Sequence, residues 1–255
     1  MGKVIAITNQ KGGVGKTTTA INLASCIAIA ERPTLLIDMD PQANATSGVG
    51  VNPEECKIST YELLINEQDG KKAAIKTNVP NLDLIPSHIR LVGAEVELVS
   101  ANGREHRLKN KIDALRDKYE YIFIDCPPSL GLLTLNSLSA SDSVLIPIQC
   151  EYYALEGLSQ LLNTVHLVQK SLNKALQIEG VLLTMYDNRL NLCNQVAGEV
   201  RDYFKEKVYK TVISRNVRLG EAPSFGKPVI MYDAVCIGSQ NYMNLAEEVL
   251  GEKNK

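Results

Sequence analysis

The feature that most constrains this 255-residue chain is a glycine-rich stretch near its start, residues 9–19, with the sequence NQKGGVGKTTT. A short apolar run, Val4 to Ile7, precedes it, and a helix-like stretch, Ala20 to Ala30, follows it. Strand, glycine loop and helix in this order form the context that a phosphate-binding loop requires. Glycines allow backbone N–H groups to turn inward around phosphate oxygens, and the following helix points its positive end at the same place. The stretch therefore predicts a binding site for nucleotide phosphates.

Two side chains in this loop are suited to nucleotide chemistry. The ammonium of Lys16 can reach the β- and γ-phosphates, and the Thr17 hydroxyl can bind Mg²⁺. The residues predicted to contact the nucleotide are Lys11, Gly12, Gly13, Val14, Gly15, Lys16, Thr17 and Thr18. The loop departs from the general pattern G-x-x-x-x-G-K-[ST], because Gln10 stands where the first glycine is expected. The alternative is a chance glycine turn with two solvated lysines, which the agreement of strand, loop and helix disfavours.

The composition is ordinary for a globular protein, with 45% apolar and 22% charged residues. The length permits one large core, so residues 1–255 are predicted to form a single domain. The net charge of −2 excludes a global basic field, so any DNA contact must come from a local patch. The six cysteines show no C-x-x-C spacing, which is typical of free thiols in a reducing cytoplasm. We see no signal peptide and no apolar run of membrane-spanning length.

Short apolar runs alternate with stretches of helical periodicity, which is the pattern of a parallel sheet with crossover helices. The predicted strands are 3–8, 34–38, 82–86, 121–125, 143–147 and 176–186. The predicted helices are 17–30, 59–65, 91–99, 104–118, 151–170, 191–204 and 239–250. Asn44 to Gly48 carries turn residues and is interpreted as a mobile switch segment. The predicted fold class is α/β, a doubly wound, mainly parallel sheet flanked by helices.

Aspartates stand at or just after the ends of two predicted strands, at Asp38, Asp40 and Asp125. The carboxyl ends of parallel strands form the crevice where such sheets bind ligands. We predict that Asp40 positions the attacking water or holds a water of Mg²⁺, and that Asp38 orients the phosphate loop. Asp125 is predicted to hold Mg²⁺ through water. The alternatives are that Asp40 caps a turn before Pro41 and that Asp125 only ends a strand.

Five stretches together carry a family resemblance that is more specific than any one of them. They are Lys11 to Thr18, Asp38 to Gly48, Ile124 to Leu133, Gln149 to Gly157 and Arg215 to Ser224. Over nearly its full length the chain resembles short ParA-type ATPases of the chromosomal Soj group. Its Lys-Gly-Gly-Val-Gly-Lys-Thr loop is similar to the deviant Walker A form of the ParA and MinD branch of phosphate-loop NTPases. The resemblance implies an ATP hydrolase that uses ATP and Mg²⁺.

The resemblance also implies a cycle. The ATP-bound monomer pairs face to face as a nucleotide-sandwich homodimer, and the dimer binds double-stranded DNA without sequence preference. A ParB-type DNA-binding partner then stimulates slow hydrolysis, which resets the monomer. The implied location is the cytoplasm, in association with the nucleoid, with no membrane binding. Whether the cargo is a chromosome or a plasmid is left open.

Site residues are carried over onto matching positions of this sequence. The resemblance implies that Lys11 reaches across the dimer to the partner's phosphates, where its charge acts much as an arginine finger does. Asn216, with the neighbouring backbone near Val217, matches the adenine-contacting segment. The implied catalytic set is Lys11, Lys16 and Asp40. The implied metal set is Thr17, Asp40 and Asp125.

Arg189 and Arg218 match family positions implicated in DNA binding. Residues 186–228 contain eight Lys or Arg and five Asp or Glu, which leaves a local charge of +3. Such a patch suits contact with backbone phosphates, which is sensitive to salt and carries no sequence information. An ordinary solvated face explains the same charges about as well.

Four departures from the family pattern affect the expected function. Ala43 stands where the family often has glycine, which stiffens the switch segment. Ser214 replaces a usual proline, which puts the rigidity of the adenine loop in doubt. Leu190 and Cys193 differ from the usual residues after Arg189. The segment 234–238 lacks basic residues often found there, so DNA contact or the response to the partner is weakened.

Other functions on the same fold make distinct demands. A MinD-like membrane-surface positioning ATPase needs a C-terminal amphipathic helix with basic and bulky apolar faces, whereas Ala246 to Lys255 is acidic and lacks aromatics. A redox protein like the nitrogenase iron protein needs a cysteine ligand pair, and a small-substrate synthetase needs a second ligand pocket. Neither is apparent in the sequence. No helix-turn-helix extension precedes the first strand, so we do not expect autonomous operator binding.

Overall fold

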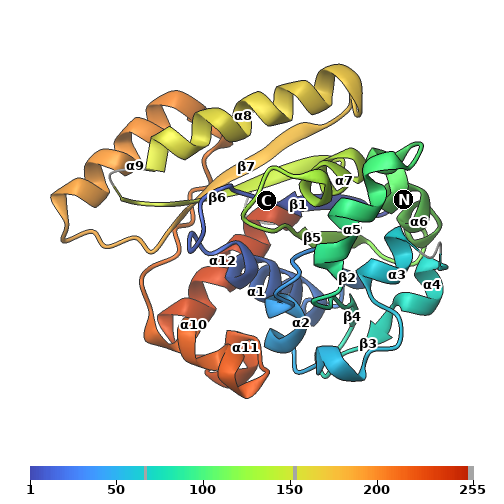
Figure 1. Ribbon diagram of the computed structural model, residues 1–255. Helices are drawn as coiled ribbons and strands as arrows, with labels where there is room; N and C mark the ends of the chain where they lie inside the picture. The colour runs from blue at the N-terminus through green and yellow to red at the C-terminus, as the bar shows by residue number, and fades with distance from the viewer. Residues whose placement is uncertain (66–67, 152–153, 252–255) are drawn as a thin grey trace.

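The computed structural model describes residues 1–65, 68–151 and 154–251. Seven strands in this part of the chain form one sheet in the order β3-β4-β2-β5-β1-β6-β7 (Figure 1). All neighbouring strands run parallel except β3, which is antiparallel to β4. The strands are β1 (Lys3–Ile7), β2 (Thr34–Asp38), β3 (Ile75–Lys76), β4 (Leu82–Ile85), β5 (Tyr121–Asp125), β6 (Ser143–Gln149) and β7 (Gln177–Thr184). The predicted doubly wound, mainly parallel sheet is confirmed.

Helices connect the strands and cover both faces of the sheet. The α-helices are α1 (Lys16–Ile29), α2 (Asn44–Gly48), α3 (Thr60–Leu64), α4 (Gly70–Ala73), α5 (Leu91–Glu97), α6 (Arg107–Ile112), α7 (Leu132–Ala140), α8 (Ala154–Ser171), α9 (Asn191–Phe204), α10 (Val217–Glu221), α11 (Val229–Tyr232) and α12 (Ile237–Leu250). Short 3₁₀ turns are η1 (Pro53–Glu55), η2 (Leu98–Ser100), η3 (Arg104–His106), η4 (Asp113–Leu115), η5 (Lys205–Lys207) and η6 (Ala222–Phe225).

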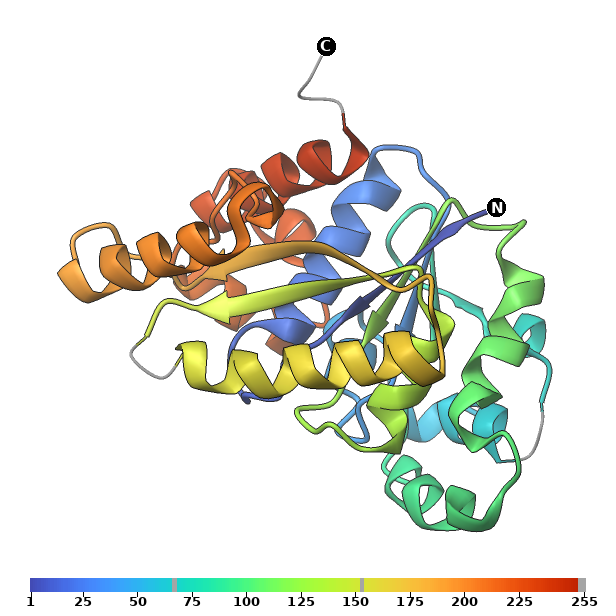
Figure 2. The ribbon, with the colours of Figure 1, turned by 90° about the horizontal axis from the view of Figure 1, so that it is seen from above.

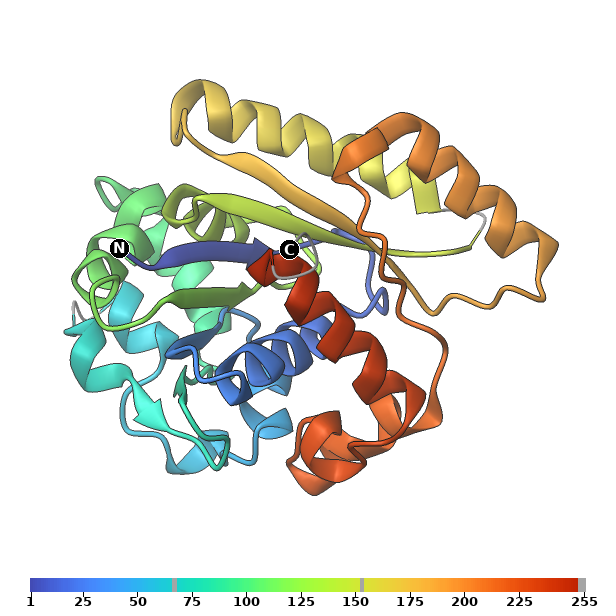
Figure 3. The same ribbon diagram turned by 180° about the vertical axis from the view of Figure 1, so that it is seen from behind.

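The two faces of the sheet belong to two separate hydrophobic cores. On β1, Val4 and Ala6 enter one core, and Ile5 and Ile7 enter the other. This follows because successive side chains of a strand point to opposite faces. Helices α3 to α9 contribute to the first core, whereas α1, α2, α11 and α12 contribute to the second, with α12 running beside α1 (Figure 3). Burial on both faces explains why the strands are nearly continuous apolar runs.

Three predicted segments differ from the structure. Residues 44–48 form the short helix α2 and not a turn, because the Asp38 carboxylate accepts hydrogen bonds from both the N–H and the hydroxyl of Thr46. The predicted helix 104–118 breaks into η3, α6 and η4, and the Leu108 N–H at the break donates to the Asn136 side chain. The predicted helix 151–170 begins at Ala154, and its residues 152–153 lie outside the described residues.

Strand β7 is the last strand of the sheet, and a later segment of the same chain covers its outer edge. Residues 208 and 214 form isolated parallel bridges with Val181 and Tyr186. Between them, the Ile213 N–H donates to the Leu183 carbonyl at 2.9 Å. Covering an edge in this way removes a template for unwanted strand pairing. It also carries the chain that follows, Ser214 to Asn216, to the carboxyl end of the sheet.

Within the described residues, we found no helix that is both long and apolar enough to span a membrane.

Candidate nucleotide site

The site is built where three neighbouring central strands end. The register pairs Asp38 at the end of β2 with Asp125 at the end of β5, and Asp125 with Ile7 at the end of β1. The glycine loop leaves from β1, so it starts beside both aspartates. The sequence predicted that these carboxylates lie in one crevice at the carboxyl ends of the strands. The pairing of β2 with β5 places Asp38 and Asp125 side by side there.

The loop takes the conformation that its glycines permit. Gly13 and Gly15 have φ angles of +75° and +86°, in the left-handed region where other residues are strained. Two polar side chains fix the loop to the sheet. The Asn9 amide donates to the Pro147 carbonyl at 2.8 Å, and the Thr184 hydroxyl donates to the Val14 carbonyl at 2.9 Å. The loop then enters α1 directly, so the first free N–H groups of a 14-residue helix face the same space.

Lys16 lies inside this loop. It is 6% exposed, and its ammonium donates to the Lys11 carbonyl at 3.0 Å across the turn of the loop. Burial lowers the pKa of the Lys16 ammonium, while the negative charges of Asp125 and Asp40 work against that shift. A buried cation beside backbone donors and next to carboxylates is suited to hold a phosphate group.

Asp125 is the least compensated charge in the site. It is fully buried, and neither of its carboxylate oxygens has a hydrogen-bond partner among the described residues. Burial raises the pKa of this carboxyl well above its usual value, the nearby Asp38 raises it further, and the Thr17 hydroxyl acts in the opposite sense. A buried carboxylate beside a threonine hydroxyl offers the hard oxygen ligands that Mg²⁺ prefers. The donor set therefore fits an Mg²⁺ ion.

The described residues contain no group of three or more His, Cys, Asp or Glu side chains arranged to hold a metal ion. Mg²⁺ is usually held by one or two protein ligands together with waters and substrate phosphates. The residues that would hold the ion are Thr17 and Asp125.

Asp38 contacts the switch segment. Its carboxylate accepts hydrogen bonds from Thr46 and from the Asp40 N–H at 2.7 to 3.1 Å, so it holds α2 in place. That Asp38 orients the phosphate loop stays a prediction. Burial raises the pKa of Asp38 to about 6, although the hydrogen bonds from Thr46 oppose that shift.

Asp40 does cap a turn, as the alternative interpretation proposed. Its Oδ1 accepts a hydrogen bond from the Gln42 N–H at 3.0 Å. The residue is nevertheless 7% exposed and close enough to Lys16 to act on its charge. Turn capping therefore coexists with a position beside the phosphate loop.

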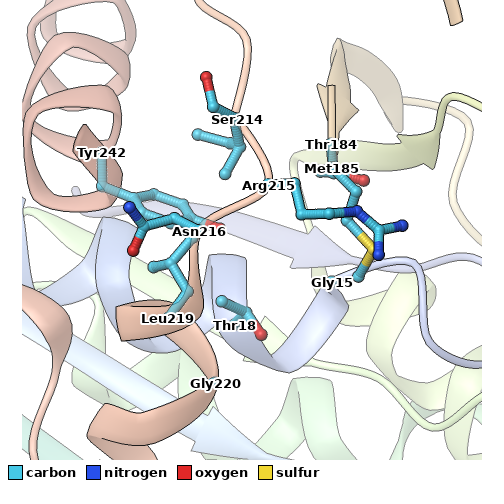
Figure 4. Close-up of a pocket in the computed structure, with 11 residues that line it drawn as sticks. Gly15, Thr18, Thr184, Met185, Ser214, Arg215, Asn216, Leu219, Gly220 and Tyr242 are labelled. Carbon is cyan, nitrogen blue, oxygen red and sulfur yellow. The ribbon is translucent and has the colours of Figure 1, made fainter. Parts of the chain in front are cut away.

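A pocket of about 250 Å³ adjoins the loop. It is lined by Gly15, Thr18, Thr184, Met185, Ile213, Ser214, Arg215, Asn216, Leu219, Gly220 and Tyr242. Figure 4 shows Asn216, Leu219 and Tyr242 on one side of this pocket and Arg215 and Met185 on the other. The size, the largely apolar lining and the contact with Gly15 and Thr18 fit a nucleotide base and sugar beside the phosphates. Asn216 thus lines the same pocket as Gly15 and Thr18 of the phosphate-loop region. Val217 is 75% exposed and does not line the pocket.

Lys11 points to a residue of its own chain. Its ammonium lies 3.6 Å from Oε2 of Glu151, and the Arg215 guanidinium lies 3.8 Å from Oε1 of the same carboxylate. Glu151 therefore connects the phosphate loop, the base pocket and the start of the segment that leads to α8. These side chains are partly exposed, so each ion pair stabilises the arrangement only weakly.

The chain was compared with known proteins. A family model described as an AAA domain matches residues 2–178. The sporulation initiation inhibitor protein Soj of Bacillus subtilis is 61% identical over 249 residues, covering 98% of each chain. The chromosome partitioning protein ParA of Myxococcus xanthus is 54% identical over 250 residues, covering 98% of this chain and 88% of that protein. The chain belongs to the Soj and ParA family of partitioning ATPases.

A solved structure outside the partitioning proteins also resembles this member of the family. Cobyrinic acid a,c-diamide synthase from Mycobacterium smegmatis, with bound ADP and magnesium, matches with a TM-score of 0.87 and 34% sequence identity. The match covers 100% of this chain and 96% of that one. The same fold therefore occurs in proteins named for partitioning and in a protein named as a synthase.

Two departures from the family pattern gain a structural explanation. Ala43 has a φ angle of +52°, so a residue with a Cβ occupies a left-handed position where glycine would be unstrained. The Ser214 N–H donates to the Asn241 side chain at 2.9 Å. Proline has no N–H, so a proline at this position could not make the hydrogen bond that holds the predicted adenine loop here.

The two predicted DNA-binding arginines are exposed but paired. The Arg189 guanidinium contacts Asp187 at 2.7 Å, and the Arg218 guanidinium contacts Glu221 at 2.7 Å and Asp233 at 3.4 Å. Within the basic segment 186–228, helix α9 packs on one face of the sheet and Ala222 of η6 packs on the other.

Several residues of the site were missed by sequence reasoning. Asn9, Thr184, Met185, Leu219 and Tyr242 lie in four separate parts of the chain and are brought together by the fold. Asn9 had a signal, because a buried amide next to a glycine loop needs a partner. The other four had none, since Thr, Met, Leu and Tyr are common in strand ends and helices.

Proposed function

We propose that this chain is an ATP-driven DNA segregation switch, with residues 1–255 acting as one domain. ATP binding drives sandwich dimerisation and sequence-independent binding to DNA of the nucleoid. Slow, Mg²⁺-dependent hydrolysis, stimulated by a ParB-type partner, resets the monomer. The observation that carries this proposal is the buried, unpartnered Asp125 carboxylate beside Lys16, Thr17 and a base-sized pocket, in a chain 61% identical to Soj.

Binding begins with the phosphate loop. The backbone N–H groups of the loop and the Lys16 ammonium hold the β- and γ-phosphates. The phosphate oxygens then replace the Lys11 carbonyl as the acceptor of the Lys16 hydrogen bond. The base enters the pocket between Asn216 and Tyr242. Mg²⁺, when bound, supplies positive charge to the β- and γ-phosphate oxygens, and Thr17 and Asp125 would hold it.

Hydrolysis depends on positioning and charge. Asp40 orients the water for in-line attack on the γ-phosphorus, and Lys16 stabilises the negative charge that develops on the phosphoryl oxygens. Lys11 leaves Glu151 and reaches the phosphates bound by the second subunit, where it adds further positive charge. Because Lys11 acts only in the dimer, hydrolysis is slow in the monomer.

DNA binding follows from the dimer. Arg189 and Arg218 exchange their carboxylate partners for backbone phosphates, and dimerisation doubles the number of such contacts. ATP changes DNA affinity because it binds the dimer more tightly than the monomer, so the two equilibria are linked.

Two other functions on this fold are less well supported. In a MinD-like membrane positioning ATPase, the C-terminal end would carry the membrane anchor. Here α12 ends at Leu250, and residues 252–255 lie outside the described residues. The structural likeness to a diamide synthase, at 34% identity, does not outweigh a relative that is 54% identical and is named a chromosome partitioning protein.

The experiment that tests the proposal measures binding to a non-specific DNA duplex with ATP, with ADP and without nucleotide, across a salt series. We expect tight binding only with ATP, retained by Asp40→Ala because that variant is trapped before hydrolysis. Arg218→Glu should lose binding and reduce the magnitude of the slope of log affinity against log salt, by about 0.9 for each phosphate contact removed.

A matched control separates local contact from general charge. Lys174→Glu makes the same change of two charge units at an exposed position before β7, outside segment 186–228. It should leave the ATP-dependent binding within about twofold of wild type. Absence of DNA binding with every nucleotide, while ATP still binds, would reject the segregation switch and leave the ATP site intact.

A further inference from the structure

Thr184, the last residue of β7, lies between the phosphate loop and the base pocket. Strands β6 and β7 lie side by side at one end of the sheet (Figure 2), and Thr184 is only 2% exposed. Its hydroxyl donates to the Val14 carbonyl of the loop at 2.9 Å. The same residue lines the base pocket, where Figure 4 shows it on the side of Met185 and Gly15. Thr184 therefore contacts both parts of the nucleotide site.

The sheet fixes the position of the Thr184 side chain. Gln149 of β6 pairs with Thr184 in the register of the two strands, and the Thr184 carbonyl accepts a hydrogen bond from the Cys150 N–H at 3.3 Å. A threonine side chain is also stiff, because two heavy atoms branch from its Cβ. A buried hydroxyl held in this way is a rigid anchor for a loop that is itself built from flexible glycines.

The hydrogen bond from Thr184 sets the orientation of one peptide group. Val14 and Gly15 share a trans peptide bond, and in a planar trans peptide the C=O and the N–H point in opposite directions. Because the Val14 carbonyl points to Thr184, the Gly15 N–H points away from it. Among the described residues, no acceptor is found for this N–H. It is therefore a free donor at the start of α1, where a phosphate oxygen would bind.

Gly15 by itself does not hold this orientation. A flip of the peptide plane would change ψ of Val14 and φ of Gly15 by about half a turn each, which takes φ of Gly15 from +86° to the ordinary negative range. Glycine adopts both conformations about equally well. The flipped peptide would turn the negative end of its carbonyl toward the phosphates and repel them. The Thr184 hydroxyl opposes this flip.

We propose that Thr184 is a positioning residue for phosphate binding. Its hydroxyl holds the Val14 carbonyl away from the nucleotide, so that the Gly15 N–H stays turned toward the phosphate oxygens. The inference rests on the proposed function, because it takes the glycine loop as the site that binds ATP. Loss of one hydroxyl, on a strand outside the loop, should therefore weaken the binding of phosphate groups while the base pocket keeps its shape.

The test compares Thr184→Val, which removes the hydroxyl with little change of size, with Thr184→Ser, which keeps it. Isothermal titration in the presence of Mg²⁺ measures the affinities for ADP and for pyrophosphate, which has no base. Thr184→Val should bind both probes about fivefold more weakly than wild type, since one hydrogen bond typically changes an equilibrium by about two- to tenfold. Thr184→Ser should bind both within about twofold of wild type.

Thr34→Val is the matched control. Thr34 is also fully buried, and its hydroxyl donates to the Arg32 carbonyl at 2.8 Å. It stands at the start of β2, at the opposite end of that strand from Asp38. Both valine variants lose a hydroxyl-to-carbonyl hydrogen bond, so we expect a similar fall in their thermal midpoints. Thr34→Val should nevertheless bind ADP and pyrophosphate as wild type does.

A measurement on wild type does not depend on how the variants fold. Pyrophosphate should shift the backbone amide signal of Gly15 in an NMR spectrum of isotope-labelled protein, because the Gly15 N–H gains an acceptor. Pyrophosphate binding that leaves this signal unchanged would overturn the inference. In Thr184→Val the shift should be smaller, since part of the population has the flipped peptide.

The outcomes separate this inference from the proposed function. If Thr184→Val binds both probes as tightly as wild type, or if it loses affinity for ADP alone, Thr184 does not position the loop. An equal loss of affinity in Thr34→Val would assign the effect to general stability and would also reject the inference. ATP-dependent DNA binding by wild type reports independently on the segregation switch, which fails if ADP binds and DNA does not bind with any nucleotide.

Discussion

Two buried aspartates in neighbouring parts of the sheet are treated in opposite ways. Asp83 on β4 is 2% exposed and accepts a hydrogen bond from the Tyr119 hydroxyl at 2.6 Å. Lys118 and Lys76 lie 3.0 and 2.8 Å from its carboxylate. Although burial alone would raise the pKa of Asp83, these three partners hold it below its usual value. Asp125 is equally buried, has no hydrogen-bond partner among the described residues, and has a raised pKa.

The difference shows that burial does not by itself define a functional carboxylate. At the β4 edge, cations and a hydroxyl compensate the charge, so Asp83 stabilises the fold. At the carboxyl end of β5, the Lys16 charge and the Thr17 hydroxyl oppose the effect of burial on Asp125 only in part, so its pKa stays raised and its charge has a net cost in stability. Such a position is stabilised when a cation binds. The two aspartates therefore predict opposite results when each is neutralised.

The largest expected effect is that of Lys16→Ala. Removal of the cation inside the phosphate loop should lower the ATPase rate by about 10²–10³-fold, because the developing phosphoryl charge loses a fixed partner. The thermal midpoint should change little, since burial already disfavours the charged form of Lys16. Steady-state hydrolysis and thermal unfolding measure the two effects. Lys76→Ala, at the β4 edge, should leave the ATPase rate unchanged.

Asp125→Asn should separate stability from activity. Without nucleotide and with a chelator present, the free energy of unfolding should rise by about 1 kcal/mol or more, because an uncompensated buried charge is removed. The ATPase rate should fall by about 10²-fold and lose its Mg²⁺ dependence. Denaturant unfolding with and without Mg²⁺ and ATP measures both. A less stable variant would contradict the comparison drawn above.

Asp83→Asn should do the reverse. At neutral pH it should lower the free energy of unfolding by about 1–3 kcal/mol, since hydrogen bonds to a charged group are lost. The ATPase rate per folded molecule should not change.

The pH dependence of the difference in unfolding free energy between wild type and Asp83→Asn provides a second check. The folded-state pKa of Asp83 is lowered, so its contribution is fully present above the unfolded value of about 3.9. It is lost as the pH falls through the lower folded-state value. The difference in stability between wild type and Asp83→Asn should therefore begin to shrink below about pH 4 and vanish only below the lowered folded-state pKa. A difference that persists there would assign the effect to packing.

The smallest effect is expected from Ser214→Pro. Proline removes the N–H that donates to Asn241, which should cost about 1 kcal/mol of stability and weaken nucleotide binding several-fold. Ser214→Ala keeps the N–H and should match wild type. Isothermal titration with ADP measures the affinity. If the proline variant binds ADP as tightly as Ser214→Ala does, the hydrogen bond does not fix the adenine loop.

Six of the seven strands in the described residues were predicted, because both faces of the sheet are buried, whereas the two-residue strand β3 was not. Each of these strands is a short apolar run, such as Tyr121 to Asp125. The predicted bounds of these strands lie within one or two residues of the observed bounds. The short helix α2 was not predicted. Segment 44–48 looked like a turn, since the helix there depends on Thr46 bonding to Asp38, which lies on another element. Propensity is a weak guide where a single tertiary contact decides.

The sequence by itself determined the phosphate loop, the aspartates at strand ends and the family, because each depends on residues close together in the chain. Only the tertiary structure decided which carboxylates are compensated. The sequence placed Asp125 at the end of a predicted strand and Asp83 inside another, but it did not show which of the two carboxylates has nearby cations. Strand order and helix packing bring Lys118 and Tyr119 to one of them and leave the other facing the phosphate loop. Compensation of a buried charge requires partners within a few ångströms, and only the folded chain supplies those distances.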